Sequence, residues 1–121
     1  MSKAINNAEL KTKMNPYIIL FSAITCEVIG TMLLPASQSF TKAIPTILLT
    51  LSYILSFYLL ALIAEKIPLP ILYASWAGLG VCLVAVLNYL FYNQTLSWQA
   101  VVGLFLIIAG VSLVNIFKGD L

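Results

Sequence analysis

Four long apolar blocks, separated by short polar connections, constrain this chain more than any other feature of its sequence. They cover approximately residues 16–34, 43–64, 69–92 and 98–117. A helix that crosses a bilayer needs about 20 apolar residues, at a rise of about 1.5 Å per residue. The blocks do not alternate between polar and apolar residues as the strands of a membrane barrel do. We therefore predict an all-α integral membrane protein with four transmembrane helices.

Composition supports the same fold class. Hydrophobic residues make up 62% of the 121 residues, and only ten side chains are charged, whereas about a quarter are charged in a typical soluble domain. Short connections make consecutive helices antiparallel neighbours. We predict a single four-helix transmembrane domain over residues 14–118, preceded by an N-terminal tail over residues 1–13. A net charge of +2 does not indicate a nucleic-acid partner.

Catalytic and metal-binding residue sets are missing from the sequence. The chain has no histidine, and its two cysteines, Cys26 and Cys82, both fall inside predicted spans. Cysteine in such places usually acts as a small buried apolar residue. We predict neither an enzyme nor a cofactor or metal site.

Lysines predict the orientation of the helices in the membrane, because loops on the cytoplasmic side carry more positive charge. An N-terminus inside the cell puts five lysines on the cytoplasmic side and leaves one, Lys42, outside. The five are Lys3, Lys11, Lys13, Lys66 and Lys118. Three of them precede Met14, so the rest of the chain carries a bias of only two to one. The tail either fixes the orientation, or it is a disordered segment or the result of an upstream start codon.

Glu27 lies near the middle of the first apolar block. A charge at that depth costs from about 2.5 to over 10 kcal/mol, so such residues usually mark a path for ions or substrates. No lysine lies inside a predicted span to neutralise it. The carboxyl group therefore either carries a proton or pairs with something outside this chain. The alternative is a neutral, hydrogen-bonded glutamate in a close helix contact.

The helix face around Glu27 consists mainly of small or apolar residues. At helical spacing, the residues that share this face are Leu20, Ala23, Ile24, Gly30 and Thr31. Three of them, Ala23, Gly30 and Thr31, are small and predict room beside the carboxylate for a bound guest. We predict that this face lines a substrate chamber.

Aromatic residues in the second and third blocks sharpen this prediction. Tyr53 and Phe57 lie one turn apart with Ser56 beside them, and Tyr73 and Trp76 share one face. Aromatic faces attract organic cations, and tyrosine and tryptophan also carry polar atoms. Aromatic belts at the membrane interface are the alternative, but Tyr73 and Trp76 lie a turn or more inside the span. The pattern predicts a binding site for a lipophilic cation.

Small residues recur within the third and fourth apolar blocks. Gly78 and Gly80 permit either close packing or a kink of the third helix. Gly103, Ala109 and Gly110 let the fourth helix approach another helix closely. We assign the fourth helix to dimerisation, since four short helices enclose little space and a second copy supplies a second Glu27.

Together these residues resemble the small multidrug resistance family of proton-coupled exporters, from Met14 to about Phe117. The matching landmarks are NPY at Asn15–Tyr17, EVIGT at Glu27–Thr31, Tyr53, Ser56, Phe57, Ile67-Pro68, Tyr73-Ala74, Trp76, Gly78, Gly80, Gln94, Leu96, Gly103, Gly110 and Asn115. The resemblance implies a multi-pass protein of a bacterial inner membrane that works as an antiparallel homodimer. In such a dimer the Glu27 carboxylates bind either protons or a small hydrophobic cation, and the chamber faces the two sides of the membrane alternately.

The resemblance also implies roles for single residues. Tyr53 and Tyr73 position the substrate, Trp76 stacks on it, and Gly78 and Gly80 allow the third helix to bend. Glycine at position 30 is typical of the quaternary-ammonium branch, because the guanidinium branch typically carries tryptophan there.

Three departures from the family pattern leave alternatives open. Pro35 replaces a lysine, Leu72 replaces a small residue, and Ala77 replaces a serine or threonine. The chain could instead export one metabolite, such as a polyamine, a guanidinium-like or a lipid-like amine, or act as one subunit of a heterodimer. A non-transporting membrane assembly protein is a further alternative of a different class.

Overall fold

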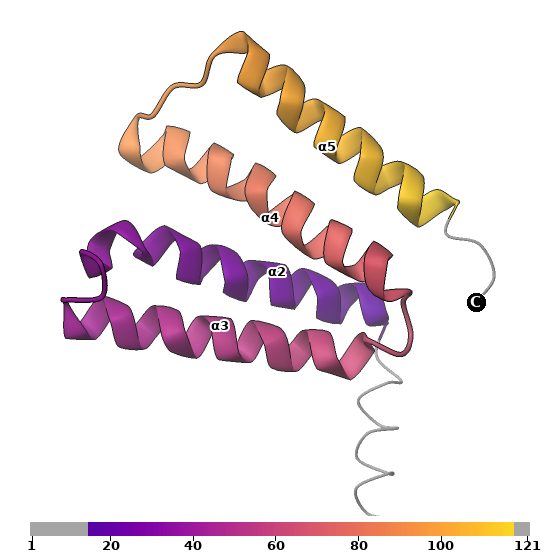
Figure 1. The fold of residues 1–121 in the computed structure, drawn as a ribbon, viewed down its shortest axis with the longest axis horizontal. Helices are drawn as coiled ribbons and strands as arrows, with labels where there is room; N and C mark the ends of the chain where they lie inside the picture. Colours follow the sequence, from indigo (N-terminus) through magenta and orange to yellow (C-terminus); the bar gives the residue numbers. More distant parts are fainter. Residues whose placement is uncertain (1–14, 118–121) are drawn as a thin grey trace, which may run out of the picture.

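The computed structural model describes residues 15–117, and these form four long helices joined by short loops (Figure 1). The helices are α2 (Pro16–Leu33), α3 (Ala43–Ile63), α4 (Leu69–Tyr92) and α5 (Trp98–Ile116), with a 3-10 turn η1 (Pro35–Ser37) after α2. Each helix begins at the expected residue and ends within one residue of the expected position. All four are long and apolar enough to cross a membrane. The predicted all-α, four-span fold is confirmed.

Parts of the sequence argument lie outside the described residues. The tail over residues 1–13 is one of them, and so are Lys3, Lys11, Lys13 and Lys118. The orientation of the helices in the membrane therefore stays a prediction.

The helix ends follow from local side-chain chemistry. Asn15 caps α2, because its Oδ1 accepts a hydrogen bond of 2.9 Å from the backbone N–H of Tyr17. Pro16 follows at the first helical position, where its missing N–H costs nothing. Ser97 caps α5 in the same way, with its hydroxyl 3.2 Å from the backbone nitrogen of Ala100. Asn93 ends α4 in a left-handed conformation with a φ of 53°.

The loop after α2 is built around a buried serine. Ser37 donates to the backbone carbonyl of Leu34 and accepts from the backbone N–H of Phe40. Gln38, Ser39 and Phe40 have φ values of 48°, 59° and 66°. Three successive left-handed residues without a glycine cost roughly 1–2 kcal/mol each, so the contacts of Ser37 stabilise a strained reversal.

In Figure 1, α2 lies between α3 and α4, and α5 lies beyond α4. Gly30 lies beside Leu49, and Ala23 accepts a hydrogen bond from Ser56. Gly30 and Ala23 are seven residues apart on α2, and their partners Leu49 and Ser56 are seven residues apart in the opposite order on α3, so the two helices run antiparallel in close contact. Helices α2 and α4 run parallel (Figure 1). The buried core sits between these three helices and consists of Ile19, Leu20, Ile24, Val28, Ile63, Ile67, Ile71 and Leu72.

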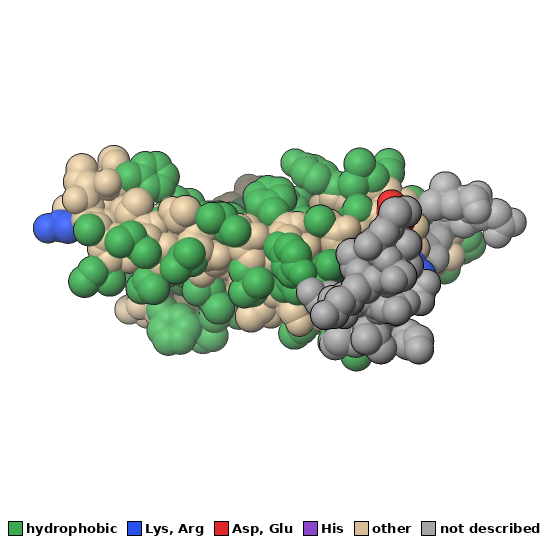
Figure 2. Space-filling view, turned by 90° about the horizontal axis from the view of Figure 1, so that it is seen from below, with side chains coloured by type: hydrophobic (Ala, Val, Ile, Leu, Met, Phe, Trp, Pro, Cys, Tyr) green, Lys and Arg blue, Asp and Glu red, His purple; other side chains and the backbone are tan. Residues whose placement is uncertain are grey.

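Helix α5 stands apart from this core. Among its 19 residues only Val111 is buried, and the helix diverges from α4 toward the 93–97 loop (Figure 1). An apolar cavity of about 470 Å³ opens between α4 and α5, with Cys82, Tyr89, Leu96 and Phe105 among its lining residues. Figure 2 shows hydrophobic side chains along the part of this face that is in view, and the charged side chains visible on it lie toward its two ends.

Candidate functional site

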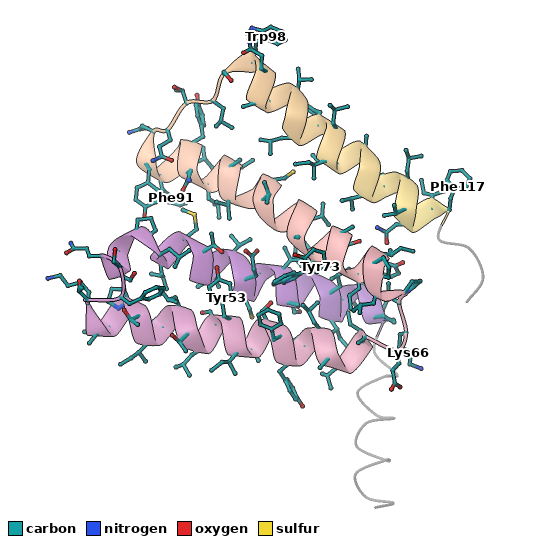
Figure 3. All side chains as sticks on the ribbon, in the orientation of Figure 1. Tyr53, Lys66, Tyr73, Phe91, Trp98 and Phe117 are labelled. Atoms are coloured by element: carbon teal, nitrogen blue, oxygen red, sulfur yellow. The ribbon has the colours of Figure 1, made fainter. Side chains whose placement is uncertain are left out.

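Glu27 lies where α2 meets both of its neighbours. Its Oε1 accepts a hydrogen bond of 2.8 Å from the hydroxyl of Thr31, one turn along α2. The same hydroxyl oxygen is hydrogen-bonded to the hydroxyl of Tyr53, which Figure 3 places between α3 and α2. Because the single hydroxyl proton of Thr31 goes to Glu27, Tyr53 is the donor to Thr31. The hydroxyl groups of Tyr53 and Thr31 thus form a hydrogen-bonded chain in which Thr31 donates to Oε1 of Glu27.

The second oxygen of the carboxylate is unpaired. Oε2 of Glu27 is buried and has no hydrogen-bond partner among the described residues. It faces Gly80 of α4, where an added Cβ would collide with it. Glycine at this position therefore makes the space that the carboxylate occupies. Burying a polar oxygen without a partner is costly, so Oε2 is the polar atom of this site whose hydrogen-bonding capacity is left unfilled among the described residues.

Gly30 serves the same site from α2. A Cβ built on Gly30 would lie 3.1 Å from Cε2 of Tyr53 and 3.3 Å from the carbonyl oxygen of Leu49. The missing side chain lets the ring of Tyr53 lie directly on α2, within reach of Thr31. The space expected beside Glu27 at Gly30 is therefore occupied by that ring.

Three other residues of the predicted face lie inside the subunit. Leu20, Ala23 and Ile24 are 4%, 0% and 1% exposed. Leu20 and Ile24 belong to the core between α2, α3 and α4. These side chains are therefore part of the packing of α2 inside the subunit.

The aromatic residues predicted for the site cluster between α3 and α4. The ring centroid of Trp76 lies 5.3 Å from that of Phe57 and 6.1 Å from that of Tyr73, and both ring pairs are tilted. An apolar cavity of about 270 Å³ adjoins the cluster. Its lining consists of Phe57, Leu60, Ala61, Ala64, Leu69, Leu72, Tyr73 and Trp76. Leu72, one of the departures from the family pattern, is therefore part of the wall of this cavity.

Ser56 connects this cluster to α2. Its hydroxyl donates to the backbone carbonyl of Ala23 at 2.7 Å and accepts from the indole N–H of Trp76 at 3.0 Å. Ser56 itself is 0% exposed. One hydroxyl group thus joins α2, α3 and α4 one helical turn away from Glu27.

Helix α4 runs unbroken through Gly78 and Gly80. Gly80 faces Glu27, and Gly78 faces α5, where an added Cβ would lie 2.8 Å from Cγ2 of Val111. Close packing is therefore one role of these glycines, and the bending of α4 stays a prediction.

The small residues of α5 lie on an open surface. Among the described residues, no neighbour beyond the surrounding turns of α5 lies within 4 Å of a Cβ built on Gly103 or Gly110, and Ala109 is exposed. Their assignment to dimerisation stays a prediction, and the subunit leaves that surface free for it.

A third polar contact was not predicted from the sequence. Asn115 of α5 donates to the hydroxyl of Ser75 at 2.8 Å, and its Oδ1 accepts from the hydroxyl of Tyr17 at 3.4 Å. Ser75 is 1% exposed. The available signal was the presence of asparagine and serine in apolar spans, where such side chains often bond across helices.

The described residues include no group of three or more histidine, cysteine, aspartate or glutamate side chains that could hold a metal ion. The polar contacts of the site come instead from hydroxyl, indole, carboxyl and backbone groups.

Comparison with known proteins identifies the family. A family model described as Small Multidrug Resistance protein matches residues 15–107. The chain is 44% identical over 105 residues to the multidrug transporter EmrE of Escherichia coli (strain K12), covering 87% of this chain and 96% of that protein. It is 41% identical over 105 residues to the quaternary ammonium compound-resistance protein QacF of Klebsiella aerogenes, with the same coverage of 87% and 96%.

A further relative is the nicotine metabolites export pump subunit NepA of Paenarthrobacter nicotinovorans, 42% identical over 102 residues, or 84% of this chain and 88% of that protein. These bacterial relatives and the four membrane-spanning helices make the chain a multi-pass protein of the bacterial inner membrane. The predicted resemblance is confirmed: the chain belongs to the Small Multidrug Resistance protein family.

Proposed function

We propose that the protein is a proton-coupled antiporter that exports lipophilic, quaternary ammonium cations. The observation that carries this proposal is the buried, unpaired Oε2 of Glu27. The charged residues of the described part are Glu27, Lys42, Glu65 and Lys66, and of these only Glu27 lies inside a helix. Its partner must therefore come from outside the subunit, as a proton or as a substrate cation.

Antiport follows if the two ligands exclude each other. Oε1 is already engaged by Thr31, which in turn is bonded to Tyr53, so a single oxygen is left for either ligand. A cation gains its electrostatic attraction only while the carboxylate is ionised. A proton that binds Oε2 removes this charge and releases the cation.

The aromatic cluster supplies the second part of a cation site. Trp76 and Gly80 are four residues apart, which is about 6 Å along α4, so the cluster lies one turn from the carboxylate. An aromatic face near a cation contributes about 0.5–2 kcal/mol, and most where water is excluded. Tyr73 and Trp76 would contact the apolar substituents of the cation, while Tyr53 acts through Thr31 on the carboxylate.

A second copy completes the chamber in this proposal. The aromatic part of the site is exposed at the surface of the subunit through Phe57 and Tyr73, and the small residues of α5 leave a surface for close helix contact. We infer a homodimer in which two Glu27 carboxylates share one chamber, with antiparallel subunits and alternating access. The names of EmrE and QacF support multidrug and quaternary ammonium substrates.

The name of NepA supports the alternative of a subunit in a pump for particular metabolites. Leu72 favours this alternative, because it narrows the aromatic cavity relative to a small residue at that position. A polyamine or guanidinium-like amine would be the substrate class to test.

One transport experiment tests the proposal. Purified protein in liposomes should move protons when a gradient of a lipophilic quaternary ammonium is imposed, and Glu27→Gln should abolish this flux. Glu65→Gln, at an exposed helix end, is the matched control and should transport normally. Equal flux in the wild type and in Glu27→Gln would overturn the mechanism. Flux driven only by a polyamine or guanidinium gradient would replace the quaternary ammonium substrate with the metabolite.

A further inference from the structure

Trp76 has a single hydrogen-bond donor, and Ser56 already binds it. The indole N–H lies 3.0 Å from the Ser56 hydroxyl oxygen, and that hydroxyl donates its own proton to the carbonyl of Ala23. A serine hydroxyl can accept and donate at once, which an alanine cannot do. Ser56 is completely buried, so no solvent competes for these bonds.

This bond determines how the indole meets the cavity. With its N–H turned toward Ser56 and one face tilted against Phe57 at 5.3 Å, Trp76 presents the remaining ring surface to the cavity that it shares with Tyr73. The N–H is also kept away from Oε2 of Glu27, an unfilled acceptor one helical turn along. If the indole were free to turn, its donor would compete with protons and cations for that oxygen.

We propose that Ser56 is a positioning residue that sets the preference of the site for aromatic over aliphatic cations. It acts through Trp76, by holding the indole in the orientation in which its face is available for stacking. The inference rests on the proposed function, because it concerns the cation that the same site binds. It goes further in naming a buried hydroxyl, which does not line the cavity, as the source of a specificity.

The test uses two cations of equal charge and similar shape, tetraphenylphosphonium and tetrabutylphosphonium. Ser56→Ala should weaken the binding of tetraphenylphosphonium about tenfold, since a lost aromatic contact of this kind is worth roughly one decade in affinity. Binding of tetrabutylphosphonium should change less than about twofold. Ser56→Thr, which keeps the hydroxyl, should restore the ratio of the two affinities.

Fluorescence reports the indole directly. The chain has two tryptophans, so Trp98→Phe, at an exposed position at the start of α5, leaves Trp76 as the sole emitter. In this background Ser56→Ala should shift the emission maximum and lower the anisotropy of Trp76. Thr50→Ala is the matched control, because the Thr50 hydroxyl is exposed and bonds only the carbonyl of Thr46 on its own helix. It should leave both signals unchanged.

The outcomes separate this inference from the proposed function. Retained binding of tetrabutylphosphonium shows that the Ser56→Ala variant is folded. An equal loss of affinity for the two cations, or an unchanged Trp76 emission, would overturn the positioning role of Ser56. Failure of the proposed function has a different signature: neither cation drives proton flux through the wild type, whatever Ser56→Ala does to binding and emission.

Discussion

Helices α2 and α5 are nearly equal in length and both are apolar enough to cross a membrane, yet they occupy opposite environments. Six of the 18 residues of α2 are buried inside the subunit, against only one of the 19 residues of α5. The core of α2 meets α3 on one side and α4 on the other, whereas α5 meets only α4 with its apolar residues, at Leu104, Ile107 and Val111 among the described contacts. Figure 3 shows the labelled ends of α5, Trp98 and Phe117, pointing away from the other helices.

The difference teaches that apolarity alone does not decide which membrane helix is buried. Lipid chains are as apolar as leucine, so helices associate through close packing and polar contacts instead. Helix α2 has both, with Gly30 against Tyr53 and the hydrogen bonds from α3 to Thr31 and to the carbonyl of Ala23. Helix α5 has two polar contacts with α4, one through Asn115 at its end and a long one from the Cys82 thiol to the carbonyl of Leu104, and no neighbour among the described residues lies within 4 Å of a Cβ built on its glycines.

The largest effect is expected from Gly80→Val compared with Gly103→Val. The new side chain at position 80 would occupy the space of Glu27 Oε2, and overpacking of this kind costs about 1–3 kcal/mol. Cation binding should therefore weaken at least about tenfold. Gly103 has open space around it, so its valine variant should fold normally as a subunit. Binding of tetraphenylphosphonium measures the effect of Gly80→Val, and unfolding of the monomeric subunit by sodium dodecyl sulphate compares both variants; equal losses of stability would contradict the contrast between the helices.

Gly30→Ala and Gly110→Ala form a milder pair. At Gly30 the added methyl group must push the ring of Tyr53 aside by a few tenths of an ångström, which should strain its bond to Thr31. We expect cation affinity to fall about threefold to tenfold, equivalent to roughly 1 kcal/mol. Gly110→Ala should leave the subunit intact and change only its self-association, measured by analytical ultracentrifugation in detergent. Normal affinity in Gly30→Ala would show that Tyr53 does not support the carboxylate.

Truncation of large side chains sharpens the comparison further. Ile24 is 1% exposed and Leu106 is 67% exposed. Ile24→Ala should lower the free energy of unfolding by about 1–2 kcal/mol, the cavity part of the cost seen in soluble cores, because the unfolded helix stays in lipid. Leu106→Ala should lower it by less than about 0.5 kcal/mol. Unfolding by sodium dodecyl sulphate in mixed micelles, at protein concentrations where the subunit is monomeric, measures both, and a large loss at Leu106 would contradict the loose packing of α5 within the subunit.

The smallest effect is expected from Asn115→Ala. Hydrogen bonds between membrane helices contribute about 0.6 kcal/mol on average, so the free energy of unfolding should change by about that amount. Amide hydrogen exchange should increase in α5 and stay unchanged in α2. Faster exchange in α2 as well would mean that the contact of Asn115 with Tyr17 also supports the start of α2.

The sequence was sufficient for the helices and for the central residue of the site, and insufficient for the contacts between helices. Helix lengths follow from bilayer thickness, and Glu27 is conspicuous because a charge in a span is costly. The bond from Trp76 to Ser56 joins residues on different helices, and its existence depends on a register that periodicity alone does not give. For the same reason, Gly30 was interpreted as free space, although the ring of Tyr53 fills it.

Gly78 and Gly80 of α4 lie two residues apart and face different neighbouring helices. At this level α4 contributes only backbone, against Glu27 on one side and against Ile107 and Val111 on the other. The two α5 residues are β-branched, and such side chains have one strongly preferred rotamer in a helix. Little on the α5 side can therefore absorb a displacement by rotating. A movement of α4 that follows the Glu27 carboxylate would therefore displace α5 as well. The packing of α4 thus links Oε2 of Glu27 to the position of the outermost helix of the subunit.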